Sequence, residues 1–306
     1  MQNVNREHPE YMSRKAMWKK YRDLYAGGER IVESAPEYLT KRQKEPVQVY
    51  QERLSRVFYE NYIGSIIDWY AATLMRREPM LQLEGCDVTA KQFYSVLSDD
   101  CDLKGTSLHE FFRQRFVQAL VCGSSFVVVD FPRAQGAALN RAEEDAMGRS
   151  RAYLVDYSAD EVINWKHDDC GGLEWAVLRT SCLHQESGWE SNWQKETRWI
   201  YYDRENYRVF RRLGDAGKIE VVDEGRHGLA ALKRVPIFEL KISEGLWLMN
   251  KAALLQLEHF NKSNALGWAL SMGLFATPVV YSDNINGGAI IDHEAPRERR
   301  FVAVEK

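Results

Sequence analysis

The spacing of apolar residues changes twice along the chain. Up to residue 125 they recur mostly at helical intervals, and from Phe126 onward they occur in short aromatic and β-branched runs separated by turn residues. Around Leu246 the helical spacing returns, and two strand-like runs follow Pro278. The pattern therefore predicts an α+β fold: helices, a largely antiparallel β-rich region, one long helix, and short strands.

Two helices are expected in the first third of the chain. Ser13 is placed to cap a helix that ends at the glycine pair 27–28. A second helix is expected to begin near Val47 and to run until Pro79. Its buried face is expected to comprise Ile63, Ile66, Ile67, Tyr70, Ala71 and Leu74, which recur at helical spacing.

The pattern divides the chain into four regions. Residues 1–125 form a helical region, 126–245 a β-rich region, 246–276 a long helix, and 277–306 the start of further strands. Within the β-rich region, the polar stretch 133–151 is expected to be a loop.

The composition favours a globular protein in a reducing compartment. Apolar residues make up 45% of the 306 residues, and a net charge of -3 does not favour a protein that wraps nucleic acid by neutralising phosphates. Five scattered cysteines without a C-x-x-C pair indicate neither a disulfide framework nor a zinc site, and the polar N-terminus does not resemble a signal peptide. Residues 263–282 carry no charge, but Pro278 and the polar residues before it argue against a membrane span.

No stretch of the sequence carries a convincing catalytic signature. The string ALVCGSSFVVVDFP, residues 119–132, has its Gly-Ser-Ser between a helix and a strand, the reverse of a nucleophile elbow, and it lacks the second glycine. We therefore expect Gly123 to end the helix, with Cys122, Ser124 and Ser125 carrying no chemistry. GDAGKIEVV favours a hairpin turn over a phosphate loop. The sequence thus predicts a protein that is not an enzyme and has no catalytic, cofactor or metal site.

Several strings, taken in order, resemble the portal proteins of tailed double-stranded DNA phages and prophages. The first is LMRREP, with Arg76, Arg77 and Pro79, and the second is the block DDCDLKGTSLHEFFRQRFVQALVCGSSFVVVDFP. The third, RAYLVDYSADEVINWKHDDCGGLEWAVLRT, is the strongest match, and the last is the long helix leading to TPVVYS. The resemblance rests on the number and order of these strings, which span most of the chain.

The resemblance implies a structural subunit of a ring, usually of about twelve copies, at one capsid vertex of the virion. The ring would form the channel for genome packaging and ejection, passing double-stranded DNA without sequence preference. Its expected partners are copies of itself, terminase, capsid or scaffold protein, and head-completion proteins. The protein itself would be made in the cytoplasm of the bacterial host and would end in the virion. Residues 126–245 would be the wing-like domain, 246–276 the stem-like helix and 277–306 the first clip-like strands. Portal chains usually continue beyond this point, so the chain is expected to be truncated.

The expected stem-like helix, from about Trp247 to Ala276, is long enough to cross the waist of a ring. Roughly 30 residues at about 1.5 Å each give a rod near 45 Å. In its second half, small residues such as Gly267 alternate with large apolar ones such as Leu266 and Leu270, a pattern that allows close packing between helices. The residues expected at a subunit interface or the channel are Leu254, Leu257, Asn261, Lys262, Gly267 and Trp268.

Two other classes of function remain open. One is a membrane-associated or partner-binding adaptor that uses residues 263–281, and the other is a hydrolase whose site is assembled from residues distant in sequence.

Overall fold

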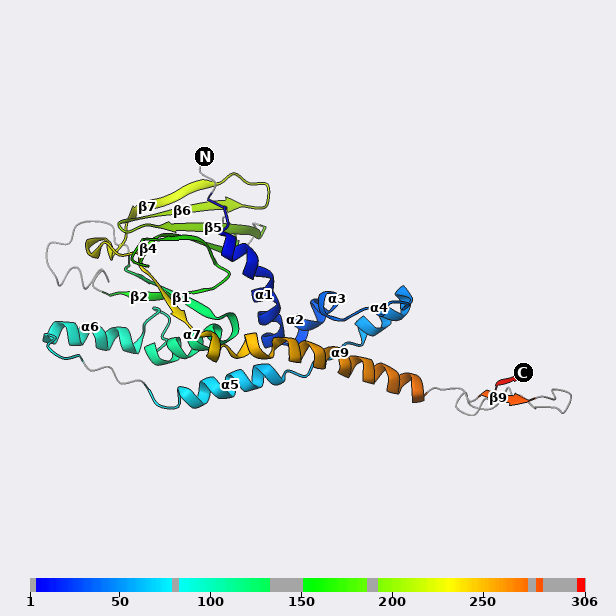
Figure 1. The fold of residues 1–306 in the computed structure, drawn as a ribbon. Helices are drawn as coiled ribbons and strands as arrows, with labels where there is room; N and C mark the ends of the chain where they lie inside the picture. Colours follow the sequence, from blue (N-terminus) through cyan, green and yellow to red (C-terminus); the bar gives the residue numbers. More distant parts are fainter. Residues whose placement is uncertain are drawn as a thin grey trace. The chain divides into compact units, whose positions relative to one another are not determined.

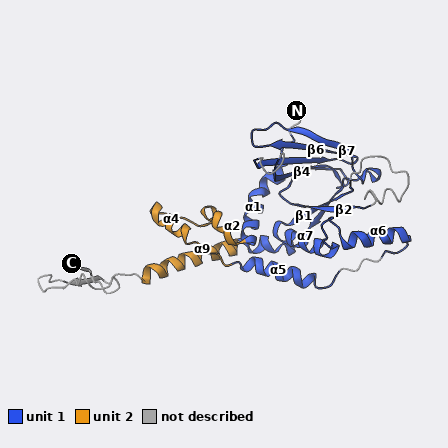
Figure 2. Ribbon diagram, turned by 180° about the vertical axis from the view of Figure 1, so that it is seen from behind, with its two compact units in different colours: residues 1–26, 61–253 blue, residues 27–60, 254–306 orange. Residues whose placement is uncertain are grey.

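The α+β prediction is confirmed in a computed structural model, which describes residues 4–78, 83–132, 151–185, 192–274, 279–282 and 302–305 (Figure 1). The chain divides into two compact units (Figure 2). Unit 1 comprises residues 1–26 and 61–253, and unit 2 comprises residues 27–60 and 254–306. The loop expected at 133–151 lies almost wholly outside the described residues, as do Pro79 and Pro278.

The helices of unit 1 begin at residues whose side chains bond to the first turn. They are α1 (Pro9–Ala26), α5 (Tyr62–Leu74), α6 (Val88–Asp99) and α7 (Leu108–Cys122). Asn61, Asp87 and Ser107 accept hydrogen bonds from backbone N–H groups three residues ahead, as N-cap residues do. The cap expected at Ser13 is wrong: α1 begins at Pro9, whose fixed φ suits a first helical position, and Ser13 lies inside the first turns.

The single helix expected from Val47 to Pro79 is also wrong, because the structure has two, α4 (Val47–Ser55) and α5. The capping bond of Asn61 starts a new helix after the interruption, and the Asn61 amide also donates to the Tyr25 carbonyl at 2.7 Å. The buried face of α5 is narrower than expected. Ile63, Ile67 and Ala71 are buried one turn apart, whereas Ile66 and Leu74 are exposed.

The strands of unit 1 form two antiparallel sheets where one largely antiparallel region was expected. The first has the order β2-β1-β8, and the second is a five-stranded meander in the order β3-β4-β5-β6-β7. The bounds are β1 (Ser124–Asp130), β2 (Tyr153–Ser158), β3 (Val162–His167), β4 (Leu173–His184), β5 (Gln194–Tyr202), β6 (Asn206–Leu213), β7 (Glu220–Arg226) and β8 (Ile237–Lys241). The short 3-10 helices Ala230–Leu232 and Glu244–Leu246 flank β8.

Strand β1 lies at the centre of unit 1, between the five-stranded sheet and the helices α6 and α7 (Figure 1). Neighbouring side chains of a strand point to opposite faces, and both faces of β1 are covered. Val128 packs into a cluster that includes Leu178 and Tyr202 of the five-stranded sheet, while Val127 packs with Phe111 of α7. This two-sided burial explains why β1 reads as a continuous apolar run rather than an alternating one.

Gly123 ends α7 and starts β1, as the sequence predicts. Its φ of 87° lies in the left-handed region, and a Cβ there would meet the Trp247 ring at 3.1 Å. Two indole N–H groups bond the last carbonyls of α7: Trp247 donates to Val121 at 3.0 Å and Trp18 to Cys122 at 2.9 Å. The Gly-Ser-Ser string is therefore a packed helix end.

Unit 2 contains short helices, most of a long helix, and two short strands. These are α2 (Gly28–Glu33), α3 (Ala35–Tyr38), α4, residues 254–274 of α9 (Leu248–Leu274), β9 (Val279–Ser282) and β10 (Val302–Glu305). Strands β9 and β10 pair in parallel. The strands expected after residue 277 are thus present, and α9 agrees with the long helix expected over 247–276 to within two residues at each end.

We predict that Gly123→Ala lowers the free energy of unfolding by about 1–2 kcal/mol, because a Cβ disfavours a positive φ and crowds the Trp247 ring. Urea denaturation followed by circular dichroism measures the change. Gly245→Ala is the matched control: nothing lies within 4 Å of a Cβ at that position. Equal losses of stability in the two variants would contradict the role given to Gly123.

Candidate functional site

Helix α9 carries all six residues expected at a subunit interface, and within unit 2 one side of it is fixed by side-chain amides. Asn261 donates to the Tyr38 carbonyl at 3.0 Å and accepts from the Thr40 N–H at 2.8 Å. Asn264 accepts from the Phe58 N–H at 3.1 Å and donates to the Phe58 carbonyl at 2.9 Å. Because each amide satisfies both a donor and an acceptor of the backbone, segment 38–58 is held in one register along α9.

Two further bonds extend this fixed side toward the N-terminal part of α9 in unit 2. The buried Gln256 amide donates to the Glu60 carbonyl at 2.8 Å, and the His259 ring lies 2.7 Å from the Glu60 carboxylate. Phe260, which follows His259, is buried and packs edge-on against Tyr59. The residues of this side are therefore already bonded or buried by other residues of unit 2.

Helix α9 also exposes large apolar residues to solvent, most of them C-terminal to the bonds that Asn264 makes. At 3.6 residues per turn, Leu255 and Leu266 point within about 20° of each other, and Leu266, Leu270 and Leu274 follow one turn apart. Their exposed fractions are 74%, 62%, 60% and 79%, respectively. We call Leu255, Leu266, Leu270 and Leu274 the leucine row. Exposed large apolar residues gathered on one part of a helix are typical of a surface that another chain covers.

The six residues expected at the interface do not share one side of α9. Leu254 and Lys262 are exposed, and the Lys262 ammonium lies 3.0 Å from the Glu258 carboxylate one turn earlier. Leu257 is half-buried, and Asn261 belongs to the fixed side. Gly267 and Trp268 line a cavity of about 180 Å³ beside Arg53 and Phe58.

Only part of the leucine row was predicted from the sequence. The sequence predicts an interface at Gly267 and Trp268 and not at Leu266 or Leu270, the large apolar residues on either side. A Cβ at Gly267 would meet Phe58 at 3.5 Å, so a larger side chain there would press on the inside of unit 2. The i, i+4 spacing of Leu266, Leu270 and Leu274 was the signal that identifies the exposed row.

The residues with nucleophilic or metal-binding side chains lie as follows. Cys122 and Ser125 are buried, and the Ser125 hydroxyl lies 3.4 Å from the Gln118 side-chain oxygen. His184 lies 3.2 Å from the carboxylate of the buried Glu196. Over the ranges that the structure describes, no three His, Cys, Asp or Glu side chains gather as a metal site would require. No described helix has the length and hydropathy of a membrane span.

A buried ion pair holds the loop before α4 against that helix. The Arg53 guanidinium bonds both carboxylate oxygens of Glu45, at 2.8 and 2.9 Å, and both side chains are buried. Burial alone would raise the pKa of Glu45, but the bonds from Arg53 and from the Arg42 N–H outweigh it and lower the pKa below its usual 4.5. Glu45 therefore remains a carboxylate at neutral pH.

We predict that Arg53→Met lowers the free energy of unfolding by about 3 kcal/mol at pH 7, because it leaves the Glu45 carboxylate buried without its partner. Arg56→Met is the matched control, since Arg56 pairs with Glu52 on the surface and such pairs contribute about 0.5 kcal/mol or less. Urea denaturation of both variants measures the difference. A similar change in the two would show that the buried pair is not an anchor.

The same pair predicts a dependence on pH. A carboxylate whose pKa is lowered by folding adds stability above its unfolded pKa, and that stability is lost as the pH falls through the folded value. The difference in unfolding free energy between the native protein and Arg53→Met should therefore be largest near neutral pH and shrink as the pH falls, beginning above 4.5 because burial without Arg53 raises the Glu45 pKa in the variant. Denaturation curves over this range measure it, and a difference independent of pH would contradict the assignment to Glu45.

Direct comparison does not reproduce the resemblance to portal proteins: neither a protein-family model nor a curated protein matches the chain.

Proposed function

We propose that the protein is a structural subunit of a phage portal ring, the channel for genome packaging and ejection at one vertex of the capsid. In this proposal it catalyses no reaction and holds no cofactor. About twelve copies close the ring. The ring binds terminase, capsid or scaffold protein and head-completion proteins, and double-stranded DNA passes through it without specific contacts.

The leucine row of α9 is the observation that carries the proposal. Burying an exposed leucine side chain stabilises a protein by about 1.5–3 kcal/mol. An isolated subunit lacks this stabilisation at each leucine of the row. Segment 38–60 bonds to α9 between Gln256 and Asn264, whereas three of the four leucines of the row follow Asn264, beyond the residues that hold the helix. A neighbouring subunit packed on the row would bury it.

A second apolar surface meets the other requirement of a ring. Closed rings of a single chain use heterologous contacts, in which each subunit offers two different surfaces. Helix α5 exposes Tyr62, Ile66 and Trp69, which recur at helical spacing on the side opposite its buried residues. The leucine row on unit 2 and this surface on unit 1 are two such different surfaces.

The charge of the chain is compatible with a channel that DNA moves through. A net charge of -3 gives the chain no overall positive charge to attract phosphates, and each neutralised phosphate would add affinity and resist movement. A channel subunit benefits from weak contacts, whereas a protein that stores or reads DNA benefits from strong ones.

We predict that Leu266→Asp combined with Leu270→Asp abolishes assemblies larger than a monomer, because two buried carboxylates would oppose contact at the leucine row. Native mass spectrometry of the native chain should show a ring of many copies, and the double variant should show monomers. Unchanged circular dichroism establishes that the variant is folded, as expected for two side chains that are mostly exposed.

Leu232→Asp is the matched control, because Leu232 is a leucine of unit 1 with 71% exposure that lies outside α9. It should assemble like the native chain. A native chain that stays monomeric at all concentrations, or a double variant that still forms rings, would contradict the proposal. A monomer that captures one defined partner would favour the adaptor instead.

A further inference from the structure

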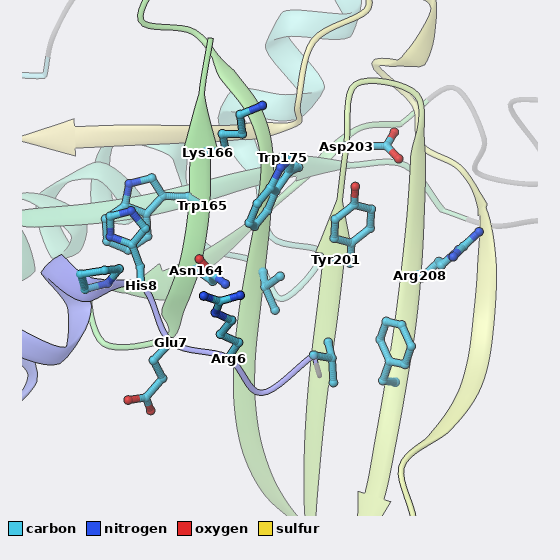
Figure 3. A pocket seen from close by; sticks show the side chains of 14 residues that line it. Arg6, Glu7, His8, Asn164, Trp165, Lys166, Trp175, Tyr201, Asp203 and Arg208 are labelled. Carbon is cyan, nitrogen blue, oxygen red and sulfur yellow. The ribbon is translucent and has the colours of Figure 1, made fainter. Parts of the chain in front are cut away.

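The outer face of the five-stranded sheet carries a groove of about 700 Å³ in unit 1 (Figure 3). The inner face of the same sheet is the core face, where Ala176, Leu178 and Tyr202 pack. The groove is bounded by the segment 4–9, which precedes and begins α1. Its side chains come from β3, β4, β5 and β6, so it crosses four neighbouring strands.

Two aromatic side chains on central strands form the floor of the groove. Trp175 of β4 and Tyr201 of β5 are diagonal neighbours in the sheet register, and their ring centroids lie 6.3 Å apart with 33° between the planes. Both are half-buried, so part of each ring faces the groove. Neither belongs to the core cluster on the inner face. The sheet thus presents an aromatic platform that its own core does not require.

The N-terminal segment closes one side of the groove and is held firmly there. The His8 N–H donates to the Ile163 carbonyl at 2.8 Å, and the His8 ring stacks on Trp165 with centroids 4.2 Å apart and 22° between planes. Glu7 is directed away from the platform (Figure 3) and pairs with Lys15 and Arg179 at 2.7 and 3.0 Å. Burial would raise the Glu7 pKa, but these two cations outweigh it and lower the pKa, so Glu7 stays ionised and committed to them.

Arg6 points from this segment toward the sheet, near Asn164 and between Trp165 and Trp175 (Figure 3). Among the residues described, it has no hydrogen-bond or ion-pair partner. A guanidinium held at the edge of an aromatic platform without an acid is placed to meet an anion.

Two further cations and one acid face the groove. Lys166 and Arg208 lie on its floor strands and pair with Glu174 and Glu224, but all four side chains are exposed, and such pairs are weak enough for a phosphate to replace. The Asp203 carboxylate accepts N–H bonds from Glu205 and Asn206 of its own turn, which partly satisfy its charge. Cations therefore outnumber uncommitted acids at the groove.

We infer that this groove binds single-stranded nucleic acid, with bases stacked on Trp175 and Tyr201 and phosphates at Arg6, Lys166 and Arg208. Aromatic side chains on a sheet beside cations are the arrangement by which proteins bind single strands, since an unpaired base offers a flat face for stacking. A duplex keeps its bases stacked on one another and offers no such face. This site lies within unit 1 and does not depend on ring assembly. A negative result for nucleic-acid binding would therefore leave the proposed function unaffected, and the reverse also holds.

The test measures fluorescence anisotropy of labelled single-stranded DNA and RNA of about 10 nucleotides, with a duplex of equal length alongside. At low salt the native protein should bind at least one single strand, bind the duplex more weakly, and show quenched tryptophan fluorescence. Trp175→Ala combined with Tyr201→Ala should weaken binding at least about fivefold, and Arg6→Ala should weaken binding and reduce its dependence on salt.

Trp193→Ala is the matched control, because Trp193 is an exposed tryptophan of unit 1 that does not line the groove, and it should bind like the native protein. Thermal unfolding establishes that each variant is folded. Arg6→Ala keeps the test valid even if the double aromatic variant unfolds, since Arg6 is exposed. Absence of binding to both single strands, equal binding of the duplex, or unchanged binding by the folded variants would overturn the inference.

Discussion

Unit 1 depends on strand β1 being buried on both faces. Its inward and outward valines join two separate clusters, one against the five-stranded sheet and one against the helices. Because β1 also pairs with β2 and β8 on its two edges, it is covered in every direction perpendicular to its length. The glycine-serine stretch before it is shaped by this requirement: α7 must end abruptly at Gly123 so that β1 can enter the core, and two tryptophans bond the carbonyls that the ending leaves.

Because β1 is buried inside unit 1, the surfaces of that unit are formed by other elements. The outer face of the meander carries aromatic and cationic side chains in a groove, while α5 exposes apolar residues opposite its buried side. In unit 2, one helix carries both the residues that bond to the rest of the unit and the residues that stay exposed. The amides of α9 bond segment 38–60, and the exposed leucine row has no such role. The proposed ring contact and the proposed nucleic-acid groove therefore use surfaces that neither core requires.

Local pattern was enough to predict most elements but not their long-range packing. Strands such as 153–158 and the long helix were predictable because β-branched runs and helical spacing act over a few residues. The interruption between α4 and α5 was missed, because its signal is one capping bond from Asn61 within an apolar stretch. The packing of segment 38–60 on α9 was missed for a different reason. It is specified by amides more than two hundred residues away in sequence, and an isolated asparagine does not indicate which backbone it bonds. The groove was missed because outward-facing aromatics on a sheet look like core residues in a sequence.

The central claim is that this chain assembles through α9 into a closed ring, and electron microscopy of the purified, negatively stained protein tests it most directly. The account predicts ring-shaped particles of uniform size with a central channel. Particles of monomer size at every concentration, or open filaments without closure, would contradict it.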